Sequence, residues 1–181
     1  MIFFFGLVSV YSVVSSTLRV NQYNKNYIIA SHLASEQLEI IKNLRDYNFK
    51  KIRPWNAINS DGSDTLWTWN YYTIENKPGS FLDMKITAIE DFQVWIEFLE
   101  SRMLDYRLCL DSEWIYSYSC TGNSKTAFYR YSYIDEVFYN DEDGARVVIE
   151  DALKIQSVVV WYQAGYHQTQ ISTILTDWQR L

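Results

Sequence analysis

Proline and glycine are scarce in this chain of 181 residues, which holds only 2 Pro and 6 Gly. Disordered and linker-rich proteins are enriched in these residues, so the composition argues against both classes. Hydrophobic residues make up 48% of the sequence, which is ample for a core. The sequence contains no internal repeat and no low-complexity tract. Its length suits one domain joined to an extended helix.

Catalytic signatures are missing as well. The sequence has no G-x-S-x-G elbow, no P-loop and no H-E-x-x-H motif. Carboxylates are plentiful, but no spacing singles out two of them as a glycosidase pair. The two histidines, His32 and His167, lie far from the cysteines and lack the spacing of metal ligands. We therefore expect neither an enzyme nor a cofactor, and an enzyme ranks third among our interpretations.

A segment from Leu7 to about Phe49 contains neither proline nor glycine and reads as one long helix. About 45 helical residues form a rod of roughly 65 Å. After Ser15 the segment keeps one apolar face, with Ile28 and Leu33 widening a stripe of residues spaced by three and four. That stripe comprises Tyr23, Tyr27, Ala30, Ala34, Leu38, Ile41 and Leu44. We expect Ala30, Ala34, Leu38 and Ile41 to pack on a sheet.

The beginning of the chain, Ile2 to Val14, is apolar but shorter than the roughly 20 residues that span a bilayer. A cleaved signal peptide is one interpretation, although a basic region and a small-residue cleavage site are lacking. We favour the interpretation that this segment serves membrane retention and helix-to-helix assembly. Its candidate residues are Ile2, Phe3, Phe4, Phe5, Leu7, Val8, Val10, Val13 and Val14.

The run from Ala30 to Asp46, ASHLASEQLEIIKNLRD, resembles the N-terminal helix of bacterial type IV pilin-like proteins. It is most similar to minor pilins and pseudopilins, in which an A-x-x-L-A-x-E-x-x-E pattern leads into Asn and Arg-Asp. A weaker likeness lies in 158–161 and 171–178. Aligned on this family, Met1 falls about ten residues inside the usual mature helix. We expect the chain to be N-terminally incomplete, through truncation or a mis-assigned start, and a real variant of the family is the alternative. The family's leader, cleavage site and conserved Glu are assigned to no residue here.

The helix and the resemblance together predict an α+β fold, in which the C-terminal half of a long helix packs on an antiparallel sheet. Residues 1–49 would form the helix, with 1–18 as its membrane or filament-core part, and residues 50–181 a β-rich head. The resemblance implies a structural subunit of a type IV pilus or a type II secretion-like pseudopilus. Its implied partners are the inner membrane before assembly and other pilin subunits afterwards, in an extracytoplasmic filament at the cell surface.

The net charge of −6 is unevenly distributed. Up to Arg53 the chain has seven Lys and Arg against three Asp and Glu, and after it nine against nineteen. A basic helix joined to an acidic head could align subunits in a stack, or the charges could simply solvate two surfaces. The acidic head argues against nucleic-acid binding, because phosphate contacts require clustered Lys and Arg.

Aromatic residues, at 17% of the sequence, mark the start of the head. Arg53-Pro54 ends the helix, and 59–64 has turn chemistry. Trp67, Trp69 and Tyr71 then alternate on one strand face. We expect them to pack under the helix against its small residues. An exposed row would instead stack on sugars, so a secreted carbohydrate-binding module is the alternative function.

Further strands are predicted by alternating apolar residues and by the turns between them. Asp91–Leu104 fits a helix and a strand equally well. The expected strands are 82–89, 127–139, 146–150, 155–162 and 166–175, with Ile155, Ser157, Val159 and Trp161 sharing one face.

The two cysteines, Cys109 and Cys120, are expected to form a disulfide if the domain is extracytoplasmic. The other interpretation is two buried free thiols. A hairpin with Cys109 opposite Cys120 would turn at Trp114 and Ile115, which are poor turn residues. Asp111–Glu113 is the better turn, so the disulfide should close an irregular loop.

A weak calcium candidate lies in the acidic turn near the end of the head. Asp141, Asp143, Gly144 and Glu150 match four positions of a calcium-loop pattern, but Tyr139 occupies the first ligand position. We favour an ordinary acidic turn.

Overall fold

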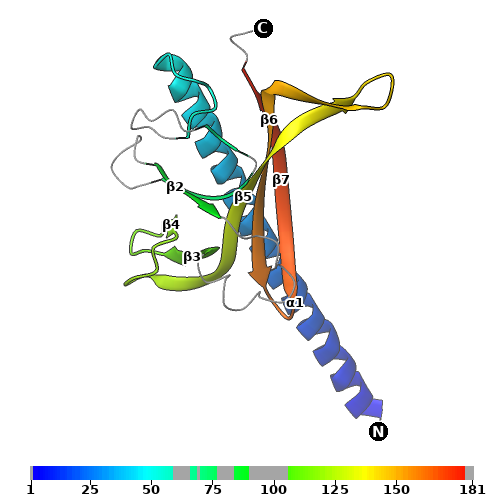
Figure 1. Cartoon of the computed structure of the whole chain (residues 1–181). Helices are drawn as coiled ribbons and strands as arrows, with labels where there is room; N and C mark the ends of the chain where they lie inside the picture. The colour runs from blue at the N-terminus through cyan, green and yellow to red at the C-terminus, as the bar shows by residue number, and fades with distance from the viewer. Residues whose placement is uncertain (1, 59–65, 69, 77–83, 90–105, 178–181) are drawn as a thin grey trace.

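Within the residues that the structure describes, one long helix lies against a seven-stranded sheet in the computed structural model (Figure 1). The fold is α+β, and the sheet pairings are antiparallel, as the sequence predicts. The structure describes residues 2–58, 66–68, 70–76, 84–89 and 106–177, without the side chains of 2–7 and 84–89. The ambiguous segment 91–104 lies outside the described residues.

The helix, α1, runs over Ile2–Lys50 without interruption. Its last turn closes with hydrogen bonds from the amides of Ile52 and Arg53 to the carbonyls of Phe49 and Asn48. Ile52 adopts a left-handed conformation with φ 55°, and Pro54 follows two residues later. The helix therefore ends where the sequence predicts, because the residue before a proline is disfavoured in the helical region.

The sheet is organised around its two longest strands, β5 and β6. Along one edge β5 pairs with β6, which pairs with β7, and along the other edge β5 pairs with β3 and then β1. β2 and β4 extend the sheet from β1 and β3. The strands are β1 (Asn70–Asn76), β2 (Met84–Ile89), β3 (Arg107–Leu110), β4 (Tyr116–Ser117), β5 (Ser124–Asn140), β6 (Arg146–Tyr162) and β7 (Tyr166–Thr176).

The predicted strands 146–150 and 155–162 are one strand, which corrects the sequence interpretation. Glu136 pairs with Leu153 but Val137 pairs with Ile149, so three residues of β6 have no opposite partner on β5. Such an irregularity bends a strand without ending it. The strand continues because β7 pairs with β6 as far as Ala152.

The core lies between α1 and the sheet, in two clusters. Ala30 and Ala34 are fully buried against the large rings of Phe128 and Trp161. Small helix residues facing large sheet residues allow the two surfaces to interdigitate at native packing density. Farther along the helix, the second cluster contains Leu38, Ile41, Leu44, Trp55, Trp67, Tyr72, Ile74, Ile134 and Ile155.

Two expected positions of apolar side chains are wrong. Ile28 is 56% exposed, because it precedes Ala30 by two residues, which turns it roughly 200° away from the buried face. Tyr71 lies on the sheet face opposite α1, where its ring contacts Tyr131 and Tyr133. Tyr72 takes the position on the helix side.

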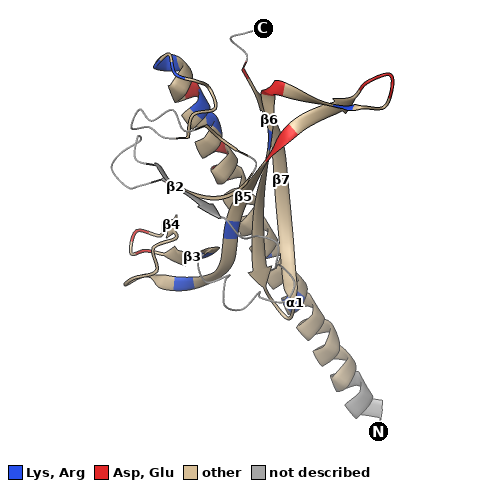
Figure 2. Ribbon diagram, in the orientation of Figure 1, with Lys and Arg blue, Asp and Glu red and all other residues tan. Residues whose placement is uncertain are grey.

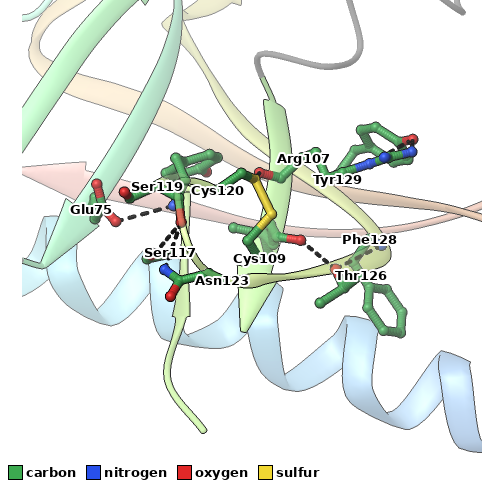
Figure 3. The surroundings of a disulfide bond; sticks show 12 residues. Glu75, Arg107, Cys109, Ser117, Ser119, Cys120, Asn123, Thr126, Phe128 and Tyr129 are labelled. Atoms are coloured by element: carbon green, nitrogen blue, oxygen red, sulfur yellow. Dashed lines mark hydrogen bonds between the residues drawn. A yellow bond between two sulfur atoms is a disulfide. The ribbon is translucent and has the colours of Figure 1, made fainter. Parts of the chain in front are cut away.

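A disulfide joins Cys109 in β3 to Cys120 in the irregular segment after β4 (Figure 3). Across the hairpin Cys109 pairs with Ser117, and the turn is capped by Asp111, whose Oδ1 accepts hydrogen bonds from the amides of Glu113 and Ile115. The disulfide is confirmed, and the loop that it closes contains the paired strands β3 and β4.

Replacing Cys109 with serine is expected to lower the free energy of unfolding by roughly 3 kcal/mol, because the bridge closes a loop of 11 residues in the unfolded chain. Denaturant unfolding measures the loss. Cys120→Ser should give the same value, since either change opens the same loop. Titration of two free thiols in the oxidised, unfolded wild-type protein would contradict the assignment.

Candidate assembly surface

The N-terminal part of α1 extends beyond the head (Figure 1). We call its described portion, Val8–Val20, the stalk. The apolar side chains of the stalk are between half and three-quarters exposed. These side chains are Val8, Val10, Tyr11, Val13, Val14, Leu18 and Val20. Monomeric soluble proteins rarely expose so extended an apolar surface.

The stalk is apolar over most of its circumference, and a polar stripe of Ser9, Ser12, Ser16 and Arg19, spaced by three and four, runs along it. No Lys, Arg, Asp or Glu occurs before Arg19. Thr17 satisfies its hydroxyl within the helix by donating a 2.9 Å hydrogen bond to the carbonyl of Val13. Within the described part of the chain, no helix combines the length and the apolar character that crossing a membrane requires.

The predicted assembly residues all lie on α1. Val8, Val10, Val13 and Val14 are exposed on the stalk. Ile2, Phe3, Phe4, Phe5 and Leu7 lie in the same helix, but their side chains are outside the described residues. The predicted packing residues Ala30, Ala34, Leu38 and Ile41 are buried under the head, in the part of α1 that follows the stalk.

Gln163 holds the junction between stalk and head. It lies in the β6–β7 turn, and its side chain accepts a 3.0 Å hydrogen bond from Asn26 and donates to the carbonyl of Arg19. Beside it, the ring of Tyr23 packs on Trp161 and His167. The stalk therefore continues a helix whose direction is fixed relative to the head.

A buried cation fixes α1 to the sheet. Arg130 of β5 is 1% exposed and donates to the carbonyl of Leu33 and the carboxylate of Glu36, both on α1. It also donates to the Ile74 carbonyl of β1 and to the Tyr118 hydroxyl. Four segments of the chain therefore meet at one guanidinium.

The electrostatics keep this guanidinium charged. Burial by itself lowers the pKa of Arg130, but Tyr118 and Glu36 together raise the pKa above its ordinary value. Burial raises the pKa of the Tyr118 phenol, so its hydroxyl remains a neutral partner. Sequence reasoning missed Arg130, although a lone Arg in the aromatic run 128–133, at an alternating position shared with Phe128 and Ile134, is a readable signal.

The aromatic row proposed as a sugar platform is divided between two places. Trp67 is buried in the core under α1, and its ring meets that of Tyr72. Tyr71 is on the opposite face, and Trp69 lies outside the described residues. On that face burial raises the pKa of Tyr131, and its side chain packs with Val158 and Val160. Trp67 and Tyr71 thus do not share one exposed surface.

The calcium candidates are not assembled into a ligand set. Asp141 uses its side chain to accept hydrogen bonds from the amides of Asp143 and Ala145, which caps the turn. Among the described residues, which include Asp141, Asp143 and Glu150, no group of three His, Cys, Asp or Glu is arranged to hold a metal ion. The segment is an acidic turn between β5 and β6.

Comparison with known proteins finds no matching family model, no matching curated protein and no matching solved structure.

Proposed function

We propose that this chain is a structural subunit of a bacterial type IV pilus or a type II secretion-like pseudopilus, of the minor pilin or pseudopilin type. The observation that carries the proposal is the exposed apolar stalk, which continues the helix that packs on the antiparallel sheet. The resemblance of Ala30–Asp46 to pilin-like helices supports it independently. The sugar-binding alternative is less well supported, because Trp67 is buried in the core.

In this function the stalk exchanges one apolar environment for another. It enters the apolar layer of the inner membrane before assembly and lies among the stalks of other copies in the filament. Burying the exposed parts of its seven apolar side chains stabilises the assembled state by roughly 1 kcal/mol for each. The fixed junction at Gln163 then presents every head at the same angle to the filament axis. The disulfide suits an extracytoplasmic head, since disulfides persist in oxidising compartments.

The test places lysine at Val10 and Val13 in the full chain. We expect the wild-type protein to pellet with membranes and to form oligomers in detergent. The double variant should pellet at least about tenfold less, because each buried charge costs about 3 kcal/mol. Deleting residues through Leu18 should release a soluble, monomeric head. Membrane sedimentation and analytical ultracentrifugation measure both effects.

Ile174→Lys is the matched control, because Ile174 is 56% exposed but lies on β7, away from the stalk. It should leave membrane retention and oligomer formation unchanged. A wild-type chain that is a stable monomer without detergent would contradict the proposed function.

A further inference from the structure

The end of β5 and the beginning of β6 form a two-stranded extension of the sheet (Figure 1). We call this segment, Val137–Ile149, the β-arm. Its strands pair with each other from Val137↔Ile149 to Asn140↔Arg146. The pairing of β6 with β7 begins only at Ala152, after the β-arm. Within the described residues the β-arm therefore has no third strand. A two-stranded hairpin alone is only marginally stable in water.

Both faces of the β-arm are apolar and exposed. Phe138 and Val148 are paired and share one face, with exposures of 47% and 40%. Tyr139 and Ile149 lie on the other face, 53% and 39% exposed. In sheets, apolar residues on both faces indicate cover on both faces. The β-arm therefore has the surface of an element that is covered by a partner.

Acidic residues surround this apolar surface. The tip carries Asp141, Glu142 and Asp143, and Glu150 and Asp151 follow at the base (Figure 2). The one cation between the tip and the base, Arg146, stacks on the Phe138 ring at 3.7 Å. A partner of the β-arm should therefore combine positive charge with an apolar contact.

This combination occurs at the end of α1 in Lys50–Arg53, which we call the basic turn. Lys50 and Lys51 are exposed, and Ile52 between them and Arg53 is 96% exposed. Ile52 has φ 55°, a conformation that is unfavourable for a β-branched residue. Hydrogen bonds to the Phe49 and Asn48 carbonyls hold the turn and present the side chain to solvent.

We propose that the β-arm of one copy docks on the basic turn of a second copy of this chain. The inference rests on the proposed function, in which the stalks bring copies side by side and raise their effective concentration. In Figures 1 and 2 the β-arm and the basic turn lie on opposite sides of the head, at the end away from the N terminus. One copy therefore engages two neighbours through two different surfaces. Such a contact is heterologous and repeats from copy to copy, which builds a ring or an open filament.

The first test is disulfide cross-linking of the full chain in membranes after brief oxidation. A chain carrying both Ile52→Cys and Val148→Cys should give a ladder of trimers and larger species on a non-reducing gel, because every copy supplies both halves of the contact. Each single variant supplies only one half of the contact and should stay monomeric on the gel. The pair Glu113→Cys and Val148→Cys is the matched control, because Glu113 is an exposed residue in a different acidic turn. It should give no ladder.

The second test exchanges the charges in the cross-linking variant. Glu142→Lys with Asp143→Lys should reduce the ladder about tenfold at low salt, because exposed attractions become repulsions. Lys50→Glu with Lys51→Glu should do the same. All four changes in one chain should restore the ladder. Glu113→Lys, in the other acidic turn, should have no effect. Asp141 is left unchanged because it caps the turn.

The outcomes separate this inference from the proposed function. Oligomers that sediment through the stalk but give no ladder, or a ladder that resists either charge reversal, would overturn the docking of the β-arm and leave the function standing. A wild-type chain that is monomeric and soluble would remove both. A ladder that charge reversal weakens and charge exchange restores supports the contact.

Discussion

Replacing Trp161 with alanine is expected to lower the free energy of unfolding by about 3–5 kcal/mol, which is the usual cost of removing a buried Trp. Trp161 is 0% exposed, pairs with Phe128 of β5 and belongs to the same core cluster as Ala30 and Ala34 of α1. The small alanines cannot fill the space that its ring leaves. The loss should therefore include a cavity term as well as the lost burial, and denaturant unfolding monitored by circular dichroism measures it.

The Tyr23 ring also rests on Trp161, so the substitution should loosen the junction between stalk and head. Hydrogen exchange of the amides near Tyr23 should accelerate more than that of amides near Leu44, which belongs to the other core cluster. Equal acceleration at both places would show that the junction does not depend on this ring.

Trp114→Ala is the matched control for this prediction. Trp114 is 79% exposed at the tip of the turn between β3 and β4, so the change should stay within about 0.5 kcal/mol. Trp161→Phe should cost less than Trp161→Ala, because it keeps an aromatic ring and removes a buried Nε1–H that has no hydrogen-bond partner. If Trp161→Ala cost no more than Trp114→Ala, the ring would not be part of the packing between helix and sheet.

The helix and its buried face were predictable because their signals are local. Spacings of three and four from Ala30 to Leu44 reflect helix geometry alone, and the same residues are buried in the structure. Turn chemistry was equally readable, as the Asp111 and Asp141 turns show. The prediction for Ile28 was wrong because we assigned this residue to the apolar stripe only for its apolar side chain. Its angle on the helix turns the side chain to solvent.

The faces of the sheet were harder to assign, because strand alternation gives two faces without saying which one meets the helix. β1 begins at Asn70, and its pairing of Tyr72 with Ser132 of β5 places Tyr72 on the side of α1. Trp67 precedes the strand, so its burial in the same core does not follow the alternation. Pairing with β5, far along the chain, decided the position of Tyr72.

The stalk and the β-arm also differ in how far the sequence reveals them. Its composition was visible in the sequence as an apolar run without charges before Arg19. The β-arm was not, because the pairing of 137–140 with 146–149 beyond the end of β7 depends on where three strands stop. A sequence shows that residues alternate, but not that neighbouring strands leave them uncovered.

Replacing Arg130 with alanine is expected to lower the free energy of unfolding by about 4 kcal/mol. The change leaves a cavity and removes the donor that serves the Leu33 carbonyl, the Ile74 carbonyl and the Tyr118 hydroxyl. Each lost hydrogen bond from a charged donor costs about 1.5–3 kcal/mol. Denaturant unfolding gives the total, and Lys125→Ala, at an exposed position of the same strand, should change it by less than about 0.5 kcal/mol.

Arg130→Met and Glu36→Gln separate the packing of this side chain from its charge. Methionine keeps most of the volume, so any loss that remains comes from the lost hydrogen bonds of the guanidinium. Glu36→Gln removes the countercharge but should cost no more than about 1 kcal/mol, because the Glu36 side chain is 49% exposed and water screens the pair. Buried ion pairs are sometimes replaced by apolar residues with a gain in stability. If Arg130→Met were as stable as the wild type, the guanidinium would not be what holds α1 to the sheet, and packing around Trp161 and Ile41 would carry the attachment alone.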